Sequence, residues 1–329
     1  MSRTFRKTER MFPRRVKRRT GFVLVCVLWV TALLSLLALG FARRAMLDRR
    51  AATYALDHAV AMAAARGAVE RGLLEILNRG LKMRFLPPER RGGTHLGEYW
   101  ARPTDFAEEG YLSKELFGEG DSVYYVITDE DRRININTAP EELLRNIPSL
   151  DRTVLRRILA RRSGEDEEDP ENRVTLFRSL EELRYFRGVD EEDWFGDGRK
   201  PGLSQLLTVW GDGRINLNTA PREVLVCIPG IEERDVDVWL NFRSGDDRQP
   251  GTEDDRGVMS LDSLTRVTGI QGRSLEAIQR FCKFDSTCFK ISGLAIRRNG
   301  RIRAFCSAVV TFTEDGPVIV DWQEKPIGS

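Results

Sequence analysis

The sequence predicts an α+β protein: a long N-terminal helix packs on an antiparallel sheet, and a large all-α segment is inserted into that sheet. Three observations predict this architecture. Residues 22–42 carry no charge, and a helical pattern continues beyond them to about residue 80. One phrase occurs twice, as RININTAP from Arg133 and as RINLNTAP from Arg214, 81 residues further along. Runs rich in β-branched and aromatic residues lie before and after the two copies.

The N-terminal segment predicts one membrane crossing. A helix over the 21 uncharged residues 22–42 is long enough to cross roughly 30 Å of hydrocarbon. Residues 1–20 contain nine Lys or Arg and a single acid, which predicts a cytoplasmic N-terminus and an outward-facing remainder. A cleaved secretory signal has a shorter apolar core, of about 7–15 residues. A plain membrane anchor is the competing interpretation.

The helix is expected to continue past the membrane. Residues 43–79 contain no proline and place apolar residues at helical spacing, namely Ala55, Leu56, Val60, Ala63, Ala64, Val69 and Leu73. A single helix from residue 22 to Asn78–Gly80 would be roughly 85 Å long. Its outer half is amphipathic and is expected to be covered by a head domain.

The N-terminus resembles that of type IV pilins and pseudopilins. The resemblance is carried by the basic leader, by Gly21-Phe22, and by the long apolar helix that begins at the phenylalanine. It implies that a prepilin peptidase cuts between Gly21 and Phe22, and that the new Phe22 amine is methylated. Most pilins have Glu at the fifth mature position, where this chain has Cys26. The K-type minor pseudopilins of type II secretion (general secretion pathway protein K family) lack that Glu as well.

The repeated phrase opens two units of about 55 residues, 134–188 and 215–269. Constant spacing over that length indicates a duplicated structure. Thr138 and Thr219 are expected to be helix N-caps, with Glu141 completing a capping box in the first unit. Pro140 and Pro221 are expected in the first helical turn. Each unit is predicted to be a helix–hairpin–helix (SAM-like) pair with an extra helix.

Helix–hairpin–helix modules often bind DNA through glycine amides of the hairpin. Here the hairpins read IPSLD over residues 147–151 and IPGIE over residues 228–232. The second glycine is missing in both, and an acid stands where a phosphate would lie, which is repulsive. A packing module is therefore favoured over a DNA-binding one.

Each unit has an acidic loop that could bind calcium, which prefers six to eight oxygen ligands. The first loop contains Glu165, Asp166, Glu167, Glu168, Asp169 and Glu171, and the second contains Asp246, Asp247, Glu253, Asp254 and Asp255. Neither has the EF-hand spacing, and a solvated acidic loop is the alternative interpretation. K-type pseudopilins bind calcium in their α-helical domain, so the resemblance implies a metal here. The second loop is the better candidate because its carboxylates flank the turn at Pro250-Gly251.

Strands are predicted over residues 122–128 and 133–136, and again over 289–296, 302–312 and 318–322. If Asn299-Gly300 centres a two-residue turn, Cys306 lies opposite Gly293 rather than Cys288. Cys282 and Cys288 then form the expected disulfide bridge. Cys26 lies in the membrane helix, and Cys227 is expected to be buried packing.

No catalytic constellation is present: the chain has two distant histidines, His58 and His95, and lacks a P-loop, a nucleophile elbow and an HExxH motif. We therefore expect no enzyme. The net charge of +2 also argues against a dedicated nucleic-acid binder.

The domain boundaries follow from these patterns. We predict a cytoplasmic leader (1–21), the transmembrane and periplasmic parts of the helix (22–42 and 43–80), the first part of a pilin-like head (81–136), the inserted α-domain (134–280), and the C-terminal strands (281–329).

The resemblance implies a single-pass inner-membrane protein with a cytoplasmic N-terminus and a periplasmic head. It implies a minor pseudopilin at the tip of the type II secretion pseudopilus, which initiates assembly for export of folded proteins across the outer membrane. The implied partners are I- and J-type minor pseudopilins, the major pseudopilin, the inner-membrane secretion platform and the prepilin peptidase. Two alternatives stay open: a DNA-binding pseudopilin or receptor of a DNA-uptake system, and a membrane-anchored periplasmic adaptor that is not processed.

Overall fold

The computed structural model describes residues 20–85, 93–102, 104–105, 118, 120–165 and 175–327. The chain forms two compact units, residues 1–56 and 57–329. Helix α1 (Thr20–Phe85) contributes its first part to the N-terminal unit and the remainder to the C-terminal unit. The prediction of one long uninterrupted helix is confirmed. Its end lies later than the predicted Asn78–Gly80, because Leu81, Lys82 and Met83 are good helix formers and the next proline after Gly80 is Pro87.

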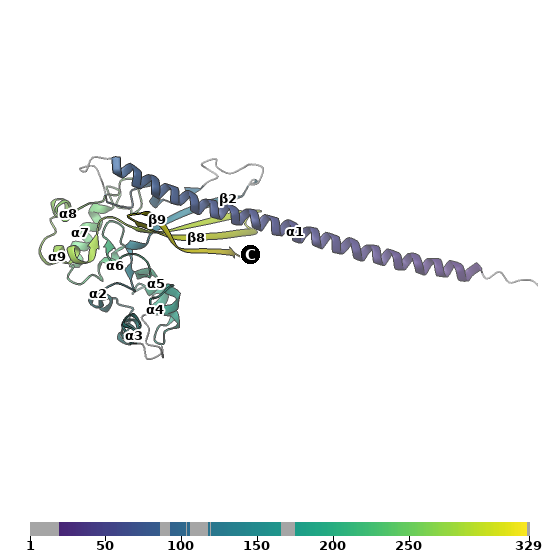
Figure 1. Cartoon of the computed structure of the whole chain (residues 1–329), viewed down its shortest axis with the longest axis horizontal. Coiled ribbons are helices and arrows are strands. Elements are labelled where there is room, and N and C mark those ends of the chain that lie inside the picture. Colours follow the sequence, from purple (N-terminus) through teal and green to yellow (C-terminus); the bar gives the residue numbers. More distant parts are fainter. Residues whose placement is uncertain are drawn as a thin grey trace, which may run out of the picture. The chain divides into compact units, whose positions relative to one another are not determined.

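A five-stranded antiparallel sheet organises the C-terminal unit, in the order β1-β2-β7-β8-β9 (Figure 1). Its strands are β1 (Thr104–Asp105), β2 (Ser122–Asp129), β7 (Cys288–Arg297), β8 (Ile302–Thr313) and β9 (Gly316–Ile327). The predicted register is confirmed, because Gly293 pairs with Cys306. The turn is longer than the predicted two residues, since Arg298, Asn299 and Gly300 all have positive φ (54°, 56° and 85°) between the paired ends of β7 and β8. Asn299-Gly300 nonetheless remains its centre.

The second half of α1 lies against one face of this sheet. Small and apolar residues of the helix share a core with β2, β7 and β8; they are Ala61, Ala65, Ala68, Val69 and Ile76. The approach is closest at Gly293, where an added Cβ would lie 2.3 Å from the Ala65 carbonyl oxygen. A glycine is therefore required on the strand for the helix to pack this closely.

A helical region is inserted between β2 and β7, which are neighbours in the sheet although residues 130–287 separate them in sequence. Figure 1 shows α6–α9 near one end of the strands and α3–α5 below the sheet in this view. This region has its own hydrophobic core, with Leu143, Leu183, Leu203, Trp239 and Leu264 fully or almost fully buried. The predicted insertion of a helical region into a sheet is confirmed, and its division into two helix–hairpin–helix repeats stays a prediction.

The elements of the insertion recur in order. The first half of the insertion forms η3 (Glu130–Arg132), β3 (Ile134–Asn135), α2 (Glu141–Arg145), α3 (Arg152–Ser163), η4 (Leu180–Tyr185), α4 (Glu191–Phe195), α5 (Leu203–Leu206) and β4 (Leu207–Thr208). A separate short helix, η2 (Tyr99–Ala101), lies before β1 and outside the insertion. The second half of the insertion forms β5 (Ile215–Asn216), α6 (Arg222–Leu225), α7 (Glu233–Arg243), α8 (Leu261–Thr268), α9 (Gly272–Phe281) and β6 (Cys282–Lys283). The short parallel pairs β3–β4 and β5–β6 close the two halves.

The helix starts in the repeated phrase differ from prediction. Pro140 and Pro221 are the N-caps of α2 and α6, with no side-chain capping bond, so Thr138 and Thr219 are not the N-caps and Glu141 completes no capping box. The Thr219 hydroxyl instead donates to Asp129 at 2.5 Å. The Thr219 hydroxyl, which the local sequence predicts to cap the helix, is thus bound to the buried Asp129 carboxylate of β2.

Candidate functional site: an apolar helix and a duplicated module

The first part of α1 is apolar and exposed. Among the described residues it is the helix long and apolar enough to cross a membrane, with a mean hydropathy of 2.8 in a stretch that is wholly unburied. Gly21 and Phe22 lie in its first turn, and Phe22 is 72% exposed. A side chain added at Gly21 would meet nothing within 4 Å, so no packing contact in this chain requires a glycine there. The basic leader before Thr20 lies outside the described residues.

The two asparagines of each repeated phrase act together. The Asn135 carboxamide oxygen accepts from the Asn137 amide at 2.8 Å, and Asn216 accepts from Asn218 at 3.0 Å in the same way. These are Asx turns, which hold the backbone between the short strand and the first helix. Asn216 and Asn218 are fully buried. The phrase therefore fixes a fold, and its polar residues are satisfied within the chain.

An arginine from the second helix of each repeat completes the motif. Arg162 of α3 donates to the Ala139 carbonyl at 2.8 Å, and Arg243 of α7 donates to the Ala220 carbonyl at 2.6 Å. Arg243 is 4% exposed, and burial lowers its pKa to about 10, which leaves it charged at neutral pH. These arginines bind the main chain of the repeated phrase, so they are not free to contact a phosphate.

The hairpins of the two repeats are likewise engaged internally. Asp151 is the N-cap of α3, and its carboxylate accepts from the Thr153 amide at 2.7 Å. In the second repeat the Glu232 amide donates to the Ser274 hydroxyl of α9 at 3.2 Å. Gly230 has a φ of 92°, and a Cβ added there would touch Ala277 at 3.4 Å. This hairpin packs on α9, which agrees with the packing interpretation of the sequence.

Three acids that the sequence analysis did not single out join the insertion to the sheet. They are Asp129, at the end of β2, and Glu130 and Asp131 in η3, and all three are almost completely buried. Asp129 accepts hydrogen bonds from the Ser286 and Thr219 hydroxyls, both at 2.5 Å, and from the Asn216 amide group at 3.2 Å. It thereby ties β2, the second repeat and the segment before β7 to one carboxylate.

The neighbouring acids extend this junction. Asp131 pairs with Lys283 at 2.7 Å and accepts from the Thr287 amide at 2.8 Å. Glu130 accepts from the Thr208 hydroxyl at 2.6 Å. Burial, and then the nearby Asp131 charge, raise the pKa of Asp129 to about 6. The three acids lie where the chain enters and leaves the insertion, so they fix its attachment.

The second acidic loop is folded around its own carboxylates. Asp254 accepts from the amides of Asp246 and Asp247 at 2.5 and 3.1 Å, and from the Thr252 hydroxyl at 2.7 Å. Asp255 accepts from the Gly251 amide at 2.6 Å. Asp246 and Glu253 instead form ion pairs, with Arg256 and Arg102 respectively.

In the part of the chain that the structure describes, no three acidic, histidine or cysteine residues are placed to hold one metal ion. The five acids of this loop therefore do not form a ligand cage in this arrangement. Calcium binding stays a prediction, and it requires the carboxylates of this loop to turn toward one common point. The first loop lies, apart from Glu165, outside the described residues.

All five cysteines are free thiols. Cys282 and Cys288, the expected disulfide, are buried on different strands, and Cys288 accepts a weak bond from the Thr311 hydroxyl at 3.6 Å. The bridge is therefore not formed in this structure. Cys227 is buried, as expected, and Cys26 is exposed on α1. Burial raises the pKa of the Cys227, Cys282 and Cys288 thiols to about 12.

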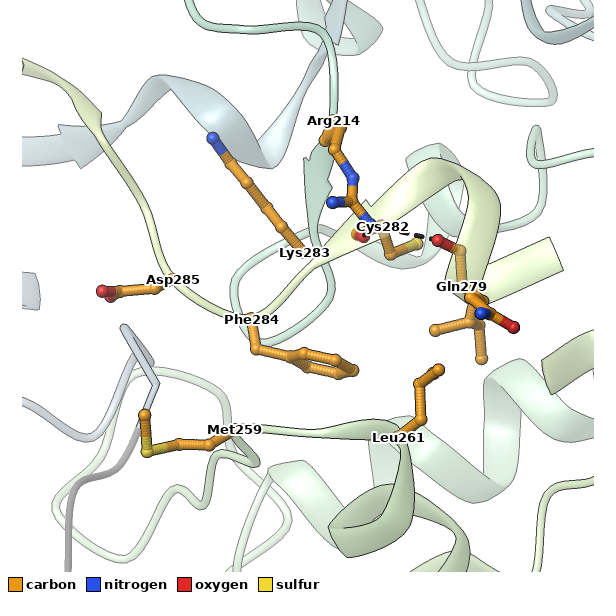
Figure 2. A pocket seen from close by; sticks show the side chains of 9 residues that line it. Arg214, Met259, Leu261, Gln279, Cys282, Lys283, Phe284 and Asp285 are labelled. Atoms are coloured by element: carbon orange, nitrogen blue, oxygen red, sulfur yellow. Dashed lines mark hydrogen bonds between the residues drawn. The ribbon is translucent and has the colours of Figure 1, made fainter. Parts of the chain in front are cut away.

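A pocket of about 310 Å³ lies where α9 meets β6. Figure 2 shows the side chains of Phe284 and Leu261 pointing into it and Arg214 lying against Cys282. Arg214 donates to the carbonyl oxygens of Cys282 and Gln279. Lys283 points out of the pocket and pairs with Asp131. The lining is largely apolar, and both of its cations are engaged, Arg214 with main-chain carbonyls and Lys283 with Asp131, so the described side chains present no nucleophile–base pair.

No family model matches this sequence, and no curated protein matches it. Among solved structures, the chain is similar to a chain in the crystal structure of the GspK–GspI–GspJ complex from the enterotoxigenic Escherichia coli type 2 secretion system. The two are 13% identical with a TM-score of 0.47, and the match covers 87% of this chain and 99% of that chain. At that identity and TM-score the similarity assigns no function, so function has to be argued from the residues themselves.

Proposed function

We propose that this chain is a K-type minor pseudopilin of a type II secretion system. It is inserted in the inner membrane by residues 22–42, with a cytoplasmic leader and a periplasmic head, and it acts by assembly rather than by catalysis. It takes the tip position of the pseudopilus and starts its assembly with I- and J-type minor pseudopilins. The resulting fibre drives folded proteins across the outer membrane.

One observation carries the proposal: α1 is a single helix with two different surfaces. Its first part is apolar and exposed on all sides, and its second part packs on an antiparallel sheet. An apolar helix of this kind is stable in a bilayer. After it leaves the membrane, it is also stable when it packs against the helices of other subunits in the core of a fibre. A plain membrane anchor does not require the helix to run on unbroken into the core of the head.

The start of α1 supports processing. Gly21 lies in a helical turn, where glycine is about 1 kcal/mol less favourable than alanine, and it has no neighbour that excludes a side chain. A glycine kept there without a packing reason suits recognition by a peptidase that cuts before Phe22.

The tip position is supported by the insertion and by Cys26. Residues 130–287 add a large helical region to the head, which makes close stacking along a thin fibre sterically difficult. Cys26 carries no charge to neutralise the terminal amine of a preceding subunit. A subunit with nothing ahead of it does not need that charge.

The test is the N-terminus of the mature protein, determined by mass spectrometry after expression with a prepilin peptidase. We expect a chain that begins at methylated Phe22. Gly21→Leu should block the cut, whereas Gly40→Ala, at a second glycine of α1 with an equally open surrounding, should not. An intact Met1, or a cut at any other bond, would remove the pseudopilin proposal in favour of an unprocessed adaptor.

A further inference from the structure

The two repeats differ in charge at one equivalent place. In the second repeat Arg222 of α6 forms ion pairs with Glu233 and Asp237 of α7, each at 3.1 Å. The residues 81 positions earlier are Glu141, Arg152 and Arg156. Every charge of this triad is reversed, so in principle the first repeat could form the same bridge with the opposite polarity.

The first repeat does not form that bridge. Glu141 pairs with Arg145, one turn along the same helix. Arg152 and Arg156 are exposed on α3, and neither forms a hydrogen bond or ion pair with any residue that the structure describes. Arg145 has no cationic counterpart, since Val226 takes its place in the second repeat. The first repeat thus has three arginines around a single glutamate.

These residues line a groove between α2 and α3 with a volume of about 410 Å³. Leu155 and Leu159 form its apolar floor, and the three arginines and Glu141 surround it. The floor is largely buried while the cations are exposed. The groove therefore offers an apolar side chain a place to pack beside two cations spaced one helical turn apart.

We propose that this groove binds an acidic segment of a partner protein. A carboxylate of the partner bridges Arg152 and Arg156, as the guanidinium of Arg222 bridges Glu233 and Asp237, and an adjacent apolar side chain of the partner packs on Leu155 and Leu159. In the second repeat the bridging group is Arg222 of the same chain, and in the first repeat it is a carboxylate of the partner. The inference does not depend on the proposed secretion role, because it rests on the two repeats alone.

The chemistry of the groove favours a protein over a nucleic acid. A nucleic acid binds to a row of cations that neutralise successive phosphates and release their counterions. Here three cations share the groove with the negative charge of Glu141. A leucine floor gives nothing to a sugar–phosphate chain, but it favours an apolar side chain that covers it and removes it from water. Exposed ion pairs are weak and are screened by salt, so the complex should be weak and salt-dependent.

The test uses the full chain in detergent micelles and a fluorescein-labelled helical peptide with two glutamates one turn apart and a leucine beside them. We expect saturable binding that weakens with added salt, and no binding of the twin peptide with glutamines. The triple variant Glu141→Arg, Arg152→Glu, Arg156→Asp copies the second repeat and should weaken binding about tenfold. Arg234→Glu, an exposed change of equal net charge, should leave it unchanged.

A reciprocal exchange separates loss of the site from loss of the fold. In the background of the triple variant, Arg222→Glu, Glu233→Arg and Asp237→Arg rebuild the cations in the second repeat and should restore part of the binding. Unchanged binding in the triple variant would overturn the proposal. Two other results would also overturn it. One is that a short DNA duplex displaces the labelled peptide at a lower concentration of phosphate groups than the concentration of carboxylates that unlabelled peptide needs. The other is that the chain associates with itself in the absence of peptide, and that this association requires Arg152 and Arg156.

Discussion

Asn137 and Asn218 make the same three hydrogen bonds, 81 residues apart. The Asn137 side chain donates to the carbonyls of Phe177 and Val209, at 2.9 and 3.2 Å, and accepts from the Phe177 amide at 2.8 Å. The Asn218 side chain donates to the carbonyls of Val258 and Phe284, at 2.9 and 2.8 Å, and accepts from the Val258 amide at 2.9 Å. Each asparagine joins the start of its repeat to the strand and loop that close it, which shows that the duplicated phrase is a structural clamp.

Replacing this clamp should destabilise the head. Asn218→Ala removes three hydrogen bonds at a fully buried position and leaves two carbonyls and an amide without partners. We expect the free energy of unfolding to fall by about 2–4 kcal/mol, and the melting temperature by roughly 5–10 °C. Circular dichroism of the full chain in detergent measures this. Asn241→Ala, at an exposed position on α7, is the control, and an equal effect there would contradict the clamp.

Local sequence patterns predicted the features that depend on neighbouring residues, such as the register of β7 and β8, and missed contacts between residues far apart in the chain. The pairing of Gly293 with Cys306 followed from the centre of the turn at Asn299-Gly300, and that centre sets the register whatever the turn length. The prediction that Thr219 is an N-cap was wrong, because its hydroxyl donates to Asp129, 90 residues away, and local sequence does not show that contact. One sequence signal did point to Asp129: it follows Val123, Tyr125 and Ile127 at every second residue, on the buried face of β2.

The buried Asp129 should make stability depend on pH. Its pKa is raised from 3.8 to about 6 in the folded chain, so the fold binds a proton more tightly than the unfolded chain does. This contribution to stability is complete below pH 3.8 and is lost as the pH rises through 6. From pH 4 to pH 7, Asp129→Asn should therefore gain about 2 kcal/mol relative to the parent.

Denaturant unfolding at a series of pH values measures that difference. The absolute stability of the variant is not the readout, because asparagine cannot accept all the bonds that the carboxylate accepts. Asp235→Asn, which lies in the first turn of α7, serves as a comparison at a carboxylate outside the junction. A constant difference between the Asp129 variant and the parent from pH 4 to pH 7 would contradict a raised pKa at the junction.

The contact between α1 and the sheet should be intolerant of a side chain at Gly293. A Cβ there would lie 2.3 Å from the Ala65 carbonyl and 3.0 Å from the Ala68 methyl, so the helix backbone would have to move. We expect Gly293→Ala to cost roughly 1–3 kcal/mol of unfolding free energy. Gly67→Ala on the exposed side of the same helix should instead be neutral, or stabilising by up to about 1 kcal/mol. Similar melting temperatures for the two variants would show that α1 does not pack here.

The thiols should react according to burial. At pH 8 Cys26 is not covered by protein, so the detergent sets its reaction with a maleimide, whereas Cys227, Cys282 and Cys288 should react slowly because burial raises their pKa to about 12. After denaturation without reductant, all five cysteines should be labelled, which intact-mass measurement counts. Three labels, with 282 and 288 missing in the peptide map, would instead show the disulfide that the sequence suggested.

The acidic loop of the second repeat gives two predictions that one experiment separates. Asp254 accepts bonds from the Thr252 hydroxyl and from two amides, and these donors lower its pKa. Its contribution to stability is present above pH 3.8 and is lost as the pH falls through the lowered folded value. Asp254→Asn should therefore lower the melting temperature at neutral pH, whether or not calcium is present.

Calcium binding would add a second, separable effect. For the predicted site, the parent should melt higher in calcium than in EDTA, by the linkage between ligand and folding, and Asp254→Asn should lose that increment. Asp262→Asn, in the first turn of α8, is the control for an acid outside the loop. Equal melting temperatures of the parent in calcium and in EDTA would leave Asp254 as a hydrogen-bond acceptor that shapes the loop, and would remove the metal from this repeat.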